Sequence, residues 1–518
     1  MAEENVSVQE NQGENNSPNL KAPKNKFIDF IDRYFKISER GSSILKELVG
    51  GLVIFLAMFY ILPLNGNMLS SDWANLAGDA QVNVKIVDNV RYILLYGDTW
   101  LTVAEVRAAV FSATAISAAV TTIVMGIYGK LPIGLASGLG LNSLIAFNVM
   151  LNLGFNFAQS MCLVMIDGIL FLIISLTPLR GWIIRNIPKS LKFAISAGIG
   201  FFICFIGFQN MGIIGNSDAT LVALGDFTNP VVIVGFVGIL LVLALSSLSA
   251  NKNKVFFWIN KFAVIISILI MAIICGSLGQ ANVKGFSPFY DSTYHISEVG
   301  NFGKVFGVAF RGFDVLKNPM AYALIFSLLF LDFFDTTGTF VGVEAGIGIV
   351  DENGKVIFND KPAMIVDAAG TVFGSICGTT TVTSFVESTT GVAAGAKTGL
   401  AAVTTGLLFA LSLLIYPLLS AFSCSAVTGL ALVYVGICMF KNLEGVEWKD
   451  WIAVGSAFIT VVVMCVAYSI SDGIAFGFMA YTIMTLCAGR FKKSDIAVCS
   501  CAIAFLAIYI VKYTTGLL

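Results

Sequence analysis

Residues 378–388 read GTTTVTSFVES, a polar run led by glycine and set between two apolar segments of the chain. Glycine and threonine are poor helix formers, so this run predicts a break in a helix and a short extended backbone. Unpaired backbone groups are tolerated at membrane depth only where protein or an aqueous cavity surrounds them. Glu387 follows the threonines by about two helical turns. The stretch therefore predicts a polar cavity with a carboxylate beside it.

The rest of the chain has the composition of a protein embedded in lipid. It has 518 residues, of which 57% are hydrophobic and 12% charged, and its mean hydropathy is +0.85. Soluble domains carry about 25% charged residues, so most of this chain is predicted to lie in the bilayer. The net charge of −1 gives no basic field that would favour nucleic acid as a partner. The ten cysteines lack a CxxC spacing and are interpreted as buried thiols.

Fifteen apolar stretches are separated by polar breaks. They cover residues 48–65, 109–128, 132–151, 160–177, 191–208, 230–248, 258–278, 318–340, 363–378, 382–396, 399–421, 425–440, 451–469, 473–488 and 497–514. A straight helix needs about 20 residues to cross a bilayer, so the two short stretches at 363–378 and 382–396 suggest a broken element. The last stretch is either a fifteenth span or a helix on the membrane surface.

Lys and Arg gather on alternate loops, as the positive-inside rule requires. With a cytoplasmic N-terminus, the loops assigned to the cytoplasm all carry basic residues. The opposite short loops carry none; they lie near 152–159, 209–229, 379–381, 422–424 and 470–472. The long loops at 66–108 and 279–317 are assigned to the exterior, and the second divides fourteen spans into seven and seven. The prediction is an all-α membrane protein of 14 transmembrane helices, arranged as two inverted 7-helix repeats as in many transporters.

The third span opens in a similar way in both halves. In the first half it begins with GLGLNS at residues 138–143, and in the second with GTTTVT at residues 378–383. If 132–142 and 376–382 are extended and meet near the midplane, two half-helices direct their positive N-termini into one cavity. The alternative is close helix packing through small residues.

Acidic residues inside apolar segments are the strongest functional candidates, because an intramembrane carboxylate is costly. They are Asp167, Asp332, Asp335, Asp367 and Glu387. A spacing of three places Asp332 and Asp335 on one helical face, and the following TTGT run, residues 336–339, is expected to end that helix early. Asp332, Asp335 and Glu387 are the strongest of the five candidates.

These acids lie among aromatic rings and hydroxyl groups. Phe333 adjoins Asp332, and Thr383 and Phe385 precede Glu387. A carboxylate can accept two parallel N–H bonds while a phenyl ring stacks on a flat ligand, so the set suits a planar heterocycle with N–H donors. Burial makes an ionised carboxylate costly, so these acids can also take up and release a proton.

Several other activities find no support in the sequence. There is no P-loop for ATP-driven pumping, no nucleophile–histidine arrangement for hydrolysis, and no selectivity-filter motif of a potassium channel. The single histidine, His295, lies in a polar stretch and excludes a multi-histidine metal site. No cofactor and no metal are therefore predicted. Another solute carrier of the same architecture and a channel remain as alternatives.

These same residues resemble a known family. The strings DFFDTTGT (332–339), DAAGT (367–371) and GTTTVTSFVES (378–388) are similar to those of the azaguanine-type guanine/hypoxanthine permeases, a branch of the nucleobase–cation symporters. GLGLN (138–142), IPKSLK (187–192) and YSISDGIA (468–475) agree as well. The matching motifs run in consistent order from about residue 36 to 490.

The resemblance implies proton-coupled import of purine bases by an elevator-like movement of a core domain against a gate domain. It implies that Asp332 and Glu387 hold the base and that Asn142 supports the site. The predicted proton-coupling residues are Asp332, Asp335 and Glu387. The implied partners are a purine base, a proton, the lipid bilayer and a second copy of the chain. The motifs do not choose among guanine, hypoxanthine and adenine, nor between a proton and sodium as the coupling ion.

The predicted domains follow from these spans. They are a disordered tail (1–25), an interfacial amphipathic segment (26–47), a first repeat (48–278; core 48–187, gate 188–278), an external loop (279–317), a second repeat (318–490; core 318–424, gate 425–490) and a C-terminal hydrophobic segment (491–518). The predicted location is the plasma or inner membrane of the cell, with the N-terminus in the cytoplasm.

Overall fold

The structure is a computed structural model, and it describes residues 26–76, 82–177, 186–217, 220–248, 256, 259–260, 262–286, 289, 296–348, 361–419 and 424–515. Within these residues the chain is mostly helical, and nine helices are long and apolar enough to cross a membrane. The prediction of a multi-pass helical membrane protein is thereby confirmed. The predictions for the tail 1–25 and for His295 fall outside the described residues.

The described part of the first half of the chain is mostly helical and contains six short strands. Its elements are α1 (Lys26–Phe35), α2 (Ile44–Met58), α3 (Ile61–Asn67), η1 (Met68–Asp72), α4 (Trp73–Leu76), β1 (Val84–Val87), β2 (Val90–Tyr96), β3 (Thr99–Thr102), α5 (Val103–Val124), η3 (Met125–Gly129), β4 (Leu135–Ser137), α6 (Leu139–Ser143), η4 (Leu144–Asn152), α7 (Phe157–Leu176), α9 (Lys189–Asn210), β5 (Ile214–Ser217), β6 (Leu221–Leu224), α10 (Pro230–Ser247) and α12 (Ala263–Gln280).

The second half is also mostly helical and has one strand among its described residues. Its elements are η6 (Ile296–Asn301), α13 (Phe302–Val305), η7 (Val308–Arg311), η8 (Phe313–Lys317), α14 (Met320–Ile347), α15 (Lys361–Cys377), β7 (Val382–Ser384), α16 (Ser388–Ala393), α17 (Gly399–Ser412), η9 (Leu413–Leu419), α18 (Ser425–Phe440), η11 (Lys441–Gly445), α19 (Trp451–Val466), α20 (Ile470–Cys487), η12 (Lys493–Asp495) and α21 (Ile496–Thr515).

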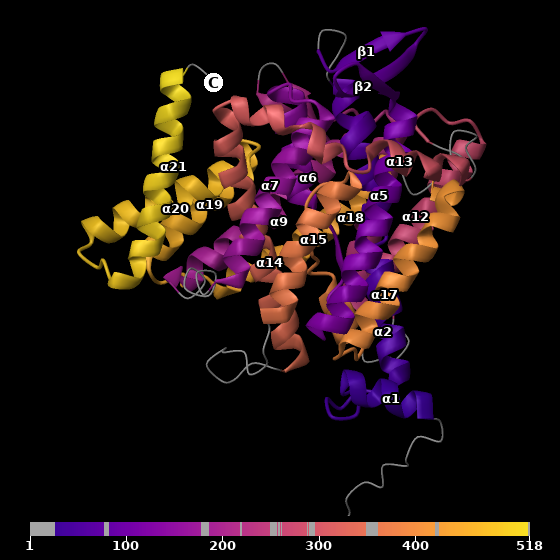
Figure 1. Cartoon of the computed structure of the whole chain (residues 1–518), viewed down its shortest axis with the longest axis horizontal. Helices are drawn as coiled ribbons and strands as arrows, with labels where there is room; N and C mark the ends of the chain where they lie inside the picture. The colour runs from indigo at the N-terminus through magenta and orange to yellow at the C-terminus, as the bar shows by residue number, and fades with distance from the viewer. Residues whose placement is uncertain are drawn as a thin grey trace, which may run out of the picture.

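The N-terminal segment is shorter than the predicted 26–47. Helix α1 ends at Phe35, and Ser43 caps a new helix, α2, by accepting from the Lys46 backbone N–H. The turn between them is held to the body of the protein, because the Arg40 guanidinium donates to the backbone oxygens of Lys130 and Lys397, each at 3.0 Å. Helix α1 lies at one end of the molecule and strands β1 and β2 at the other (Figure 1).

The first span is longer than its apolar stretch predicted. Helical structure continues beyond residue 65 through α3, η1 and α4 to Leu76. Trp73 is buried there and donates from its ring to the Leu69 backbone oxygen at 3.1 Å. The predicted exterior loop 66–108 therefore contains the end of this span, followed by the antiparallel sheet β1–β2–β3.

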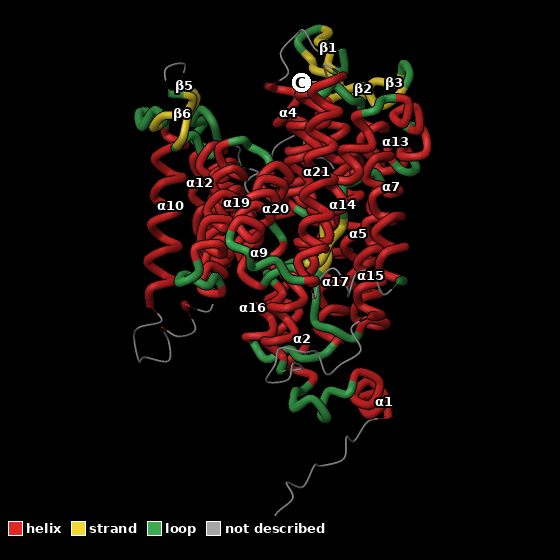
Figure 2. Tube along the Cα trace, turned by 90° about the vertical axis from the view of Figure 1, so that its left-hand side faces the viewer, coloured by secondary structure: helices red, strands yellow, loops and turns green. Residues whose placement is uncertain are grey.

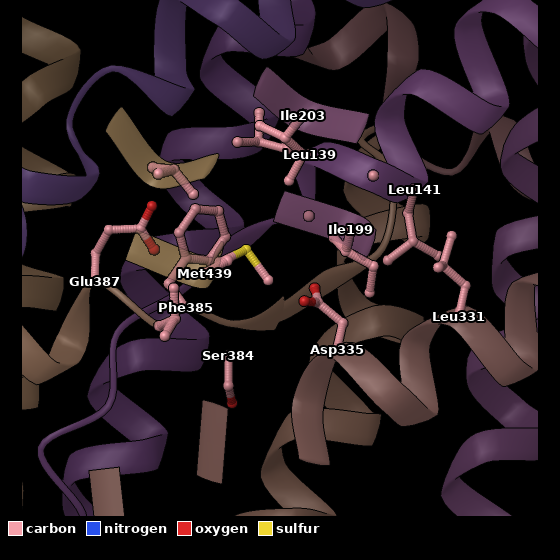
Figure 3. A pocket seen from close by; sticks show the side chains of 14 residues that line it. Leu139, Leu141, Ile199, Ile203, Leu331, Asp335, Ser384, Phe385, Glu387 and Met439 are labelled. Atoms are coloured by element: carbon pink, nitrogen blue, oxygen red, sulfur yellow. The ribbon is translucent and has the colours of Figure 1, made fainter. Parts of the chain in front are cut away.

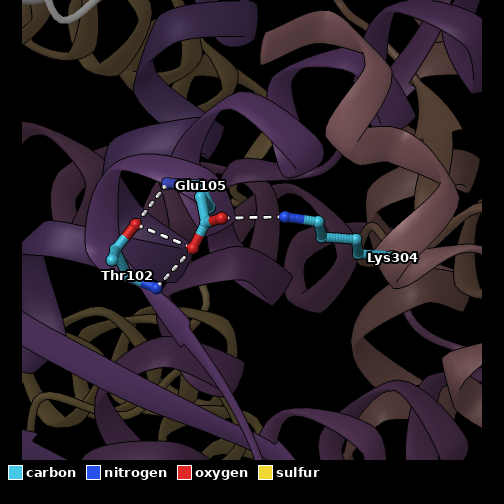
Figure 4. A network of polar contacts seen from close by, with 3 residues as sticks. All are labelled: Thr102, Glu105 and Lys304. Atoms are coloured by element: carbon cyan, nitrogen blue, oxygen red, sulfur yellow. Dashed lines mark hydrogen bonds and ion pairs between the residues drawn. The ribbon is translucent and has the colours of Figure 1, made fainter.

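A capping network fixes the start of the second span below that sheet. Thr102 and Glu105 form a capping box at the N-terminus of α5. Lys304 of α13 donates to Glu105 at 2.8 Å (Figure 4). The loop that joins the two halves is thereby connected to the sheet end of the first half.

Strands β4 and β7 lie at the two predicted breaks, but the extended backbone is shorter than the predicted 132–142 and 376–382, because residues 139–142 belong to α6 and residues 376–377 to α15. The two strands pair antiparallel with Leu135 opposite Ser384 and Ser137 opposite Val382. Two further backbone bonds extend this crossing: the Gly138 N–H donates to the Thr381 oxygen at 2.9 Å, and the Phe385 N–H donates to the Gly134 oxygen at 3.0 Å. Strand structure is visible inside the helical body in Figure 2. Each of the two breaks thus satisfies the backbone groups of the other.

Helix α14 does not end at the TTGT run, contrary to the sequence prediction. It runs for 28 residues from Met320 to Ile347, past the TTGT run. Thr337 donates back to the Phe333 oxygen at 2.6 Å, and Thr336 donates to Asp367 of α15 at 2.7 Å. The Thr336 hydroxyl is thus engaged by a neighbouring helix and does not compete for the backbone of α14, so tertiary packing overrides the low helix propensity.

The helices pack in two groups. One group contains α2, α5, α7, α15 and α17, and the other contains α9, α10, α12, α18, α19 and α20. Helix α14 contacts the first group through α7 and the second through α9 and α20. The β4–β7 crossing lies within the first group, because β4 and β7 pack against α5 and α15.

Helix α21 corresponds to the last apolar stretch. It runs antiparallel to α20: the Phe505 and Phe478 ring centroids lie 6.5 Å apart, and the Tyr509 hydroxyl donates to Asp472 at 2.6 Å. Helix α21 therefore packs against α20.

Candidate functional site

A cavity lies beside the β4–β7 crossing, between the two groups of helices. It has about 460 Å³ of space between atoms, including the part that is open to solvent. It is lined by Gly138, Leu139, Gly140, Leu141, Ile199, Ile203, Leu331, Asp335, Ser384, Phe385, Val386, Glu387, Val435 and Met439. Both broken segments, α14, α9 and α18 therefore contribute to one site. Figure 3 shows the carboxyl groups of Glu387 and Asp335 directed into the cavity.

Glu387 occupies the turn between β7 and α16. The Tyr60 hydroxyl donates to its Oε1 at 2.6 Å. This bond orients the carboxylate and uses one of its oxygens, which leaves the other oxygen toward the cavity for a ligand donor. Tyr60 comes from the first span, so the position of the acid depends on α2 and α3 as well as on its own segment.

Asp335 is the second acid of the cavity, where the sequence placed Asp332. Asp332 and Glu387 are expected to hold the base together, but Asp332 does not line the cavity that Glu387 lines. Asp332 is fully buried and accepts from Thr371 of α15 at 2.9 Å. Residues three apart on a helix differ by about 60° in direction, and that difference turns Asp335 to the cavity and Asp332 toward α7 and α15. A role for Asp332 in binding stays a prediction.

Asp367 has a structural position. It is fully buried, and its Oδ1 accepts from both the backbone N–H and the hydroxyl of Ser384, at 2.9 and 2.6 Å. Its Oδ2 accepts from Thr336, whose hydroxyl lies 2.9 Å from that of Thr383. Asp367 therefore holds strand β7 against α14, and Thr383 belongs to this support rather than to the cavity lining.

Asn142 lies beneath the crossing. Its Oδ1 accepts from Ser137 at 3.1 Å and from Thr380. Its amide nitrogen has no hydrogen-bond partner among the described residues. Asn65 of α3 continues the same hydroxyl network by donating to Thr379 at 2.8 Å. The predicted supporting role of Asn142 agrees with this position, although no ligand contact tests it.

The two aromatic residues predicted to contact the ligand lie in different places. Phe385 lines the cavity next to Glu387. Phe333 is buried and packs edge-on against Phe171 of α7 at 6.5 Å between ring centroids. A base that enters the cavity can therefore meet the ring of Phe385, whereas Phe333 fills the space between α7 and α14.

Sequence reasoning missed several residues of the site. Tyr60 and Asn65 are polar side chains inside an apolar span, and that pattern was the one sequence signal that could have identified them. Ile199, Val435 and Met439 gave no such signal, because apolar residues on α9 and α18 are indistinguishable in sequence from residues that face lipid. The six-residue α16 is also shorter than the predicted span 382–396, so its dipole contributes less than a half-helix would.

Comparisons with known proteins agree with this architecture. The family model described as "Permease family" matches residues 93–476. Adenine permease AdeQ of Escherichia coli is 34% identical over 92% of this chain and 95% of its own length. Guanine/hypoxanthine permease PbuO of Bacillus subtilis is 34% identical over 91% of this chain and 98% of its own length.

One solved structure shows the same fold at low sequence identity. The murine Solute Carrier 26 family member A9 anion transporter, in its inward-facing state, has a TM-score of 0.54 and 14% identity, covering 92% of this chain and 74% of that chain. The resemblance to guanine/hypoxanthine permeases that the sequence motifs indicated is confirmed by the relatives. The chain is a multi-pass membrane protein that belongs to the Permease family.

Proposed function

We propose that this protein is a secondary transporter that imports purine nucleobases together with protons. The observation that carries the proposal is the pair of carboxyl groups, Asp335 and Glu387, that face one cavity beside two interrupted helices. The relatives named as adenine and guanine/hypoxanthine permeases support the purine class.

The cavity offers a purine three kinds of contact. Glu387 and Asp335 supply acceptors for N–H groups of the base, and a charged acceptor makes such bonds stronger than neutral ones. Phe385 supplies an aromatic face. Leu139, Leu141 and Ile199 supply apolar walls. Guanine, hypoxanthine and adenine all carry N–H donors, so each fits this description.

Proton coupling follows from the same acids. Two negative charges in one largely buried cavity repel each other and are poorly solvated. Uptake of a proton by one of them removes that cost and leaves the other to bind the base. Release of the proton on the other side of the membrane then weakens the site and lets the base leave.

The arrangement of helices supports an elevator-like movement. Glu387 and Asp335 belong to the elements that pack with α2, α5, α7 and α15, whereas Ile199 and Met439 come from α9 and α18. In the proposal the first group is the core and the second the gate of two inverted seven-helix repeats, with α21 as an additional span. The protein would lie in the cell membrane with α1 in the cytoplasm, and a homodimer remains part of the prediction.

A binding panel tests the substrate class. The purified protein is titrated with adenine, guanine, hypoxanthine, xanthine, uracil and cytosine at one acidic and one alkaline pH. We expect at least one of the first three bases to bind, more tightly at acidic pH, and the pyrimidines not to compete. Binding of uracil alone, or binding of a purine that is equal at both pH values, would contradict the substrate class or the proton coupling respectively.

A further inference from the structure

Three helices meet behind the cavity at a second pair of acids. Asp167 lies on α7 and Asp332 on α14, and α7 packs against both α14 and α15. The edge-on contact of Phe171 with Phe333 places the adjacent faces of α7 and α14 together. A Cβ added at Gly168 would lie 2.8 Å from the Thr371 side chain of α15. The Asp167 turn of α7 therefore sits directly against the residues that surround Asp332.

Both acids are buried without the partners that a buried charge needs. Asp167 and Asp332 are each 0% exposed. Neither oxygen of Asp167 has a hydrogen-bond partner among the described residues, and neither does Oδ1 of Asp332. An isolated buried carboxylate is far too costly to remain ionised, so such a group binds a cation or a proton instead.

The charged groups around the pair are acidic. Asp167, Asp367 and Asp335 are the acids that act electrostatically on Asp332. Asp367 is already engaged by Ser384 and Thr336. None of the ion pairs found among the described residues involves Asp167 or Asp332.

The elements packed against α7 and α14 bring a few further charged groups. Elements η7 and η8, which carry Arg311, Asp314 and Lys317, pack against α7, and Gln159 in the first turn of α7 donates to Asp314 at 2.9 Å. Asp167 lies ten residues after Phe157, which is about 15 Å along the helix. Glu387 precedes α16 and faces the cavity, and Arg91 lies on β2 at the exterior end. Lys361 on α15 and Lys189 and Lys192 on α9 belong to further packed elements, but no described basic group is among those that act electrostatically on Asp167 or Asp332.

We infer that Asp167 and Asp332 form a second protonation site, separate from the cavity. Binding of a proton at this site changes the hydrogen bonding of strand β7. The inference rests on the proposed proton-coupled transport and extends it to acids that do not line the substrate cavity. Protonation neutralises one carboxylate, with the proton supplied by water, and no other bond changes.

Thr371 provides the connection to the cavity. Its hydroxyl lies 2.9 Å from Asp332 Oδ2 and 3.3 Å from the backbone oxygen of Val382 in β7. A hydroxyl has only one hydrogen to donate, so the two acceptors compete for it. Ionised Asp332 takes this hydrogen, and protonated Asp332 leaves it to Val382. Because β7 leads into Ser384, Phe385 and Glu387, protonation behind the cavity alters the backbone that shapes it.

The first test is the pH profile of purine uptake in Asp167→Asn. A like charge on a neighbouring buried group changes proton affinity by about one pH unit or more. Removing the Asp167 charge makes ionisation of Asp332 easier, so the midpoint of the profile should move about one unit to lower pH. Asp167→Glu should retain the wild-type midpoint. A merely structural role would lower uptake equally at every pH, and an unchanged midpoint in Asp167→Asn would overturn the inference.

A matched control on the same helix separates packing from charge. Ser160 is fully buried two turns before Asp167 and donates to the Asn156 backbone oxygen at 3.0 Å. Ser160→Ala disturbs the same face of α7 without changing a titratable group. Its pH midpoint should equal that of the wild type, and a shift as large as that of Asp167→Asn would count against the carboxyl pair.

An infrared measurement keeps this inference distinct from the proposed function. Difference spectra of the purified protein in lipid, between acidic and alkaline buffer and without any purine, report protonated carboxyl groups directly. We expect a carboxylic-acid band that is lost or shifted in Asp167→Asn and unchanged in Ser160→Ala. A band that Asp167→Asn leaves unaltered would overturn the second site even if uptake is proton-coupled. Failure of purine binding with the expected band present would overturn the proposed function alone.

Discussion

The two broken spans share a backbone plan and differ in chemistry. Each contributes a three-residue strand, and the strands pair with each other. After β4 the chain turns into α6, and the residues that reach the cavity are Gly138, Leu139, Gly140 and Leu141. After β7 the chain reaches the cavity with Ser384, Phe385, Val386 and Glu387. The first break forms an apolar wall, and the second supplies the aromatic ring and the charge.

This difference shows how two similar backbone breaks can build a site with unequal halves. Asn142, the polar residue of the first break, is directed into the hydroxyls of Ser137 and Thr380 beneath the crossing. Glu387, its counterpart in the second, is oriented toward the cavity by Tyr60. One polar residue stabilises the crossing and the other is available to a ligand. The comparison predicts that mutations in the two breaks fail in different ways.

The largest effect is expected from Glu387→Gln. The amide keeps the size of the side chain and can still accept from Tyr60, but the charged acceptor is lost. Truncating one partner of a buried charged pair costs about 2–5 kcal/mol, so initial purine uptake should fall roughly a hundredfold or more, with normal amounts of protein in the membrane.

Glu444→Gln serves as the control for this substitution. Glu444 lies in η11, is exposed and does not line the cavity. Its uptake should match that of the wild type when membrane amounts are compared by immunoblot. Uptake by Glu387→Gln within a few fold of the wild type would remove the distinction between the two breaks.

An intermediate effect is expected from Asn142→Ala. The substitution leaves the hydroxyls of Ser137 and Thr380 without their shared acceptor in a fully buried region, which costs about 1–3 kcal/mol. The melting temperature of the purified protein should fall, while the affinity for purine in the protein that remains folded should change little. Asn148→Ala, on the half-buried face of the adjoining η4 segment, should leave the melting temperature nearly unchanged. A large loss of affinity with normal stability would instead make Asn142 a ligand contact.

The breaks could be predicted from the sequence because the signal for each lies within one short run of residues. A run such as GTTTVT can be recognised without knowledge of the fold. Strand β7 overlaps this run, and β4 directly precedes the GLGLNS run of the first half. The sequence could not choose between Asp332 and Asp335, because residues three apart share a helical face and only the packing of α7 and α15 decides which one is enclosed. It also ended α14 too early, since Thr336 and Thr339 are satisfied by Asp367 and the Ser384 backbone oxygen, which are distant in sequence.

The opposite wall of the cavity was beyond sequence reasoning for a different reason. Val435 and Met439 of α18 lie in a segment that is apolar throughout, so no periodicity separates cavity, protein and lipid faces. Tyr60 was missed because its partner, Glu387, is 327 residues away. Local chemistry can thus be predicted from sequence, whereas the pairing of distant segments requires the fold.

The smallest effect is expected at the edge of the first break, where Gly140 meets the other group of helices. A Cβ at Gly140 would lie 2.8 Å from the Cδ1 atom of Ile470 on α20, whereas a Cβ at Gly138 would contact Thr383 within the crossing. The Ile470 contact is with the end of a flexible side chain, so the strain of Gly140→Ala should be near the lower limit of about 1 kcal/mol for overpacking. If α6 slides along α20 during transport, the added methyl group should slow uptake a few fold without changing purine affinity.

A double substitution tests whether the contact between residue 140 and Ile470 limits the movement of α6 along α20. Ile470→Val shortens the side chain that the new methyl group meets, so Gly140→Ala combined with Ile470→Val should recover most of the uptake rate. Gly300→Ala, where a Cβ has no neighbour within 4 Å, should behave as the wild type. A fall in affinity for Gly140→Ala that Ile470→Val does not reverse would place the effect in the cavity itself. The first break would then contribute to binding and not only form the wall along which the two groups move.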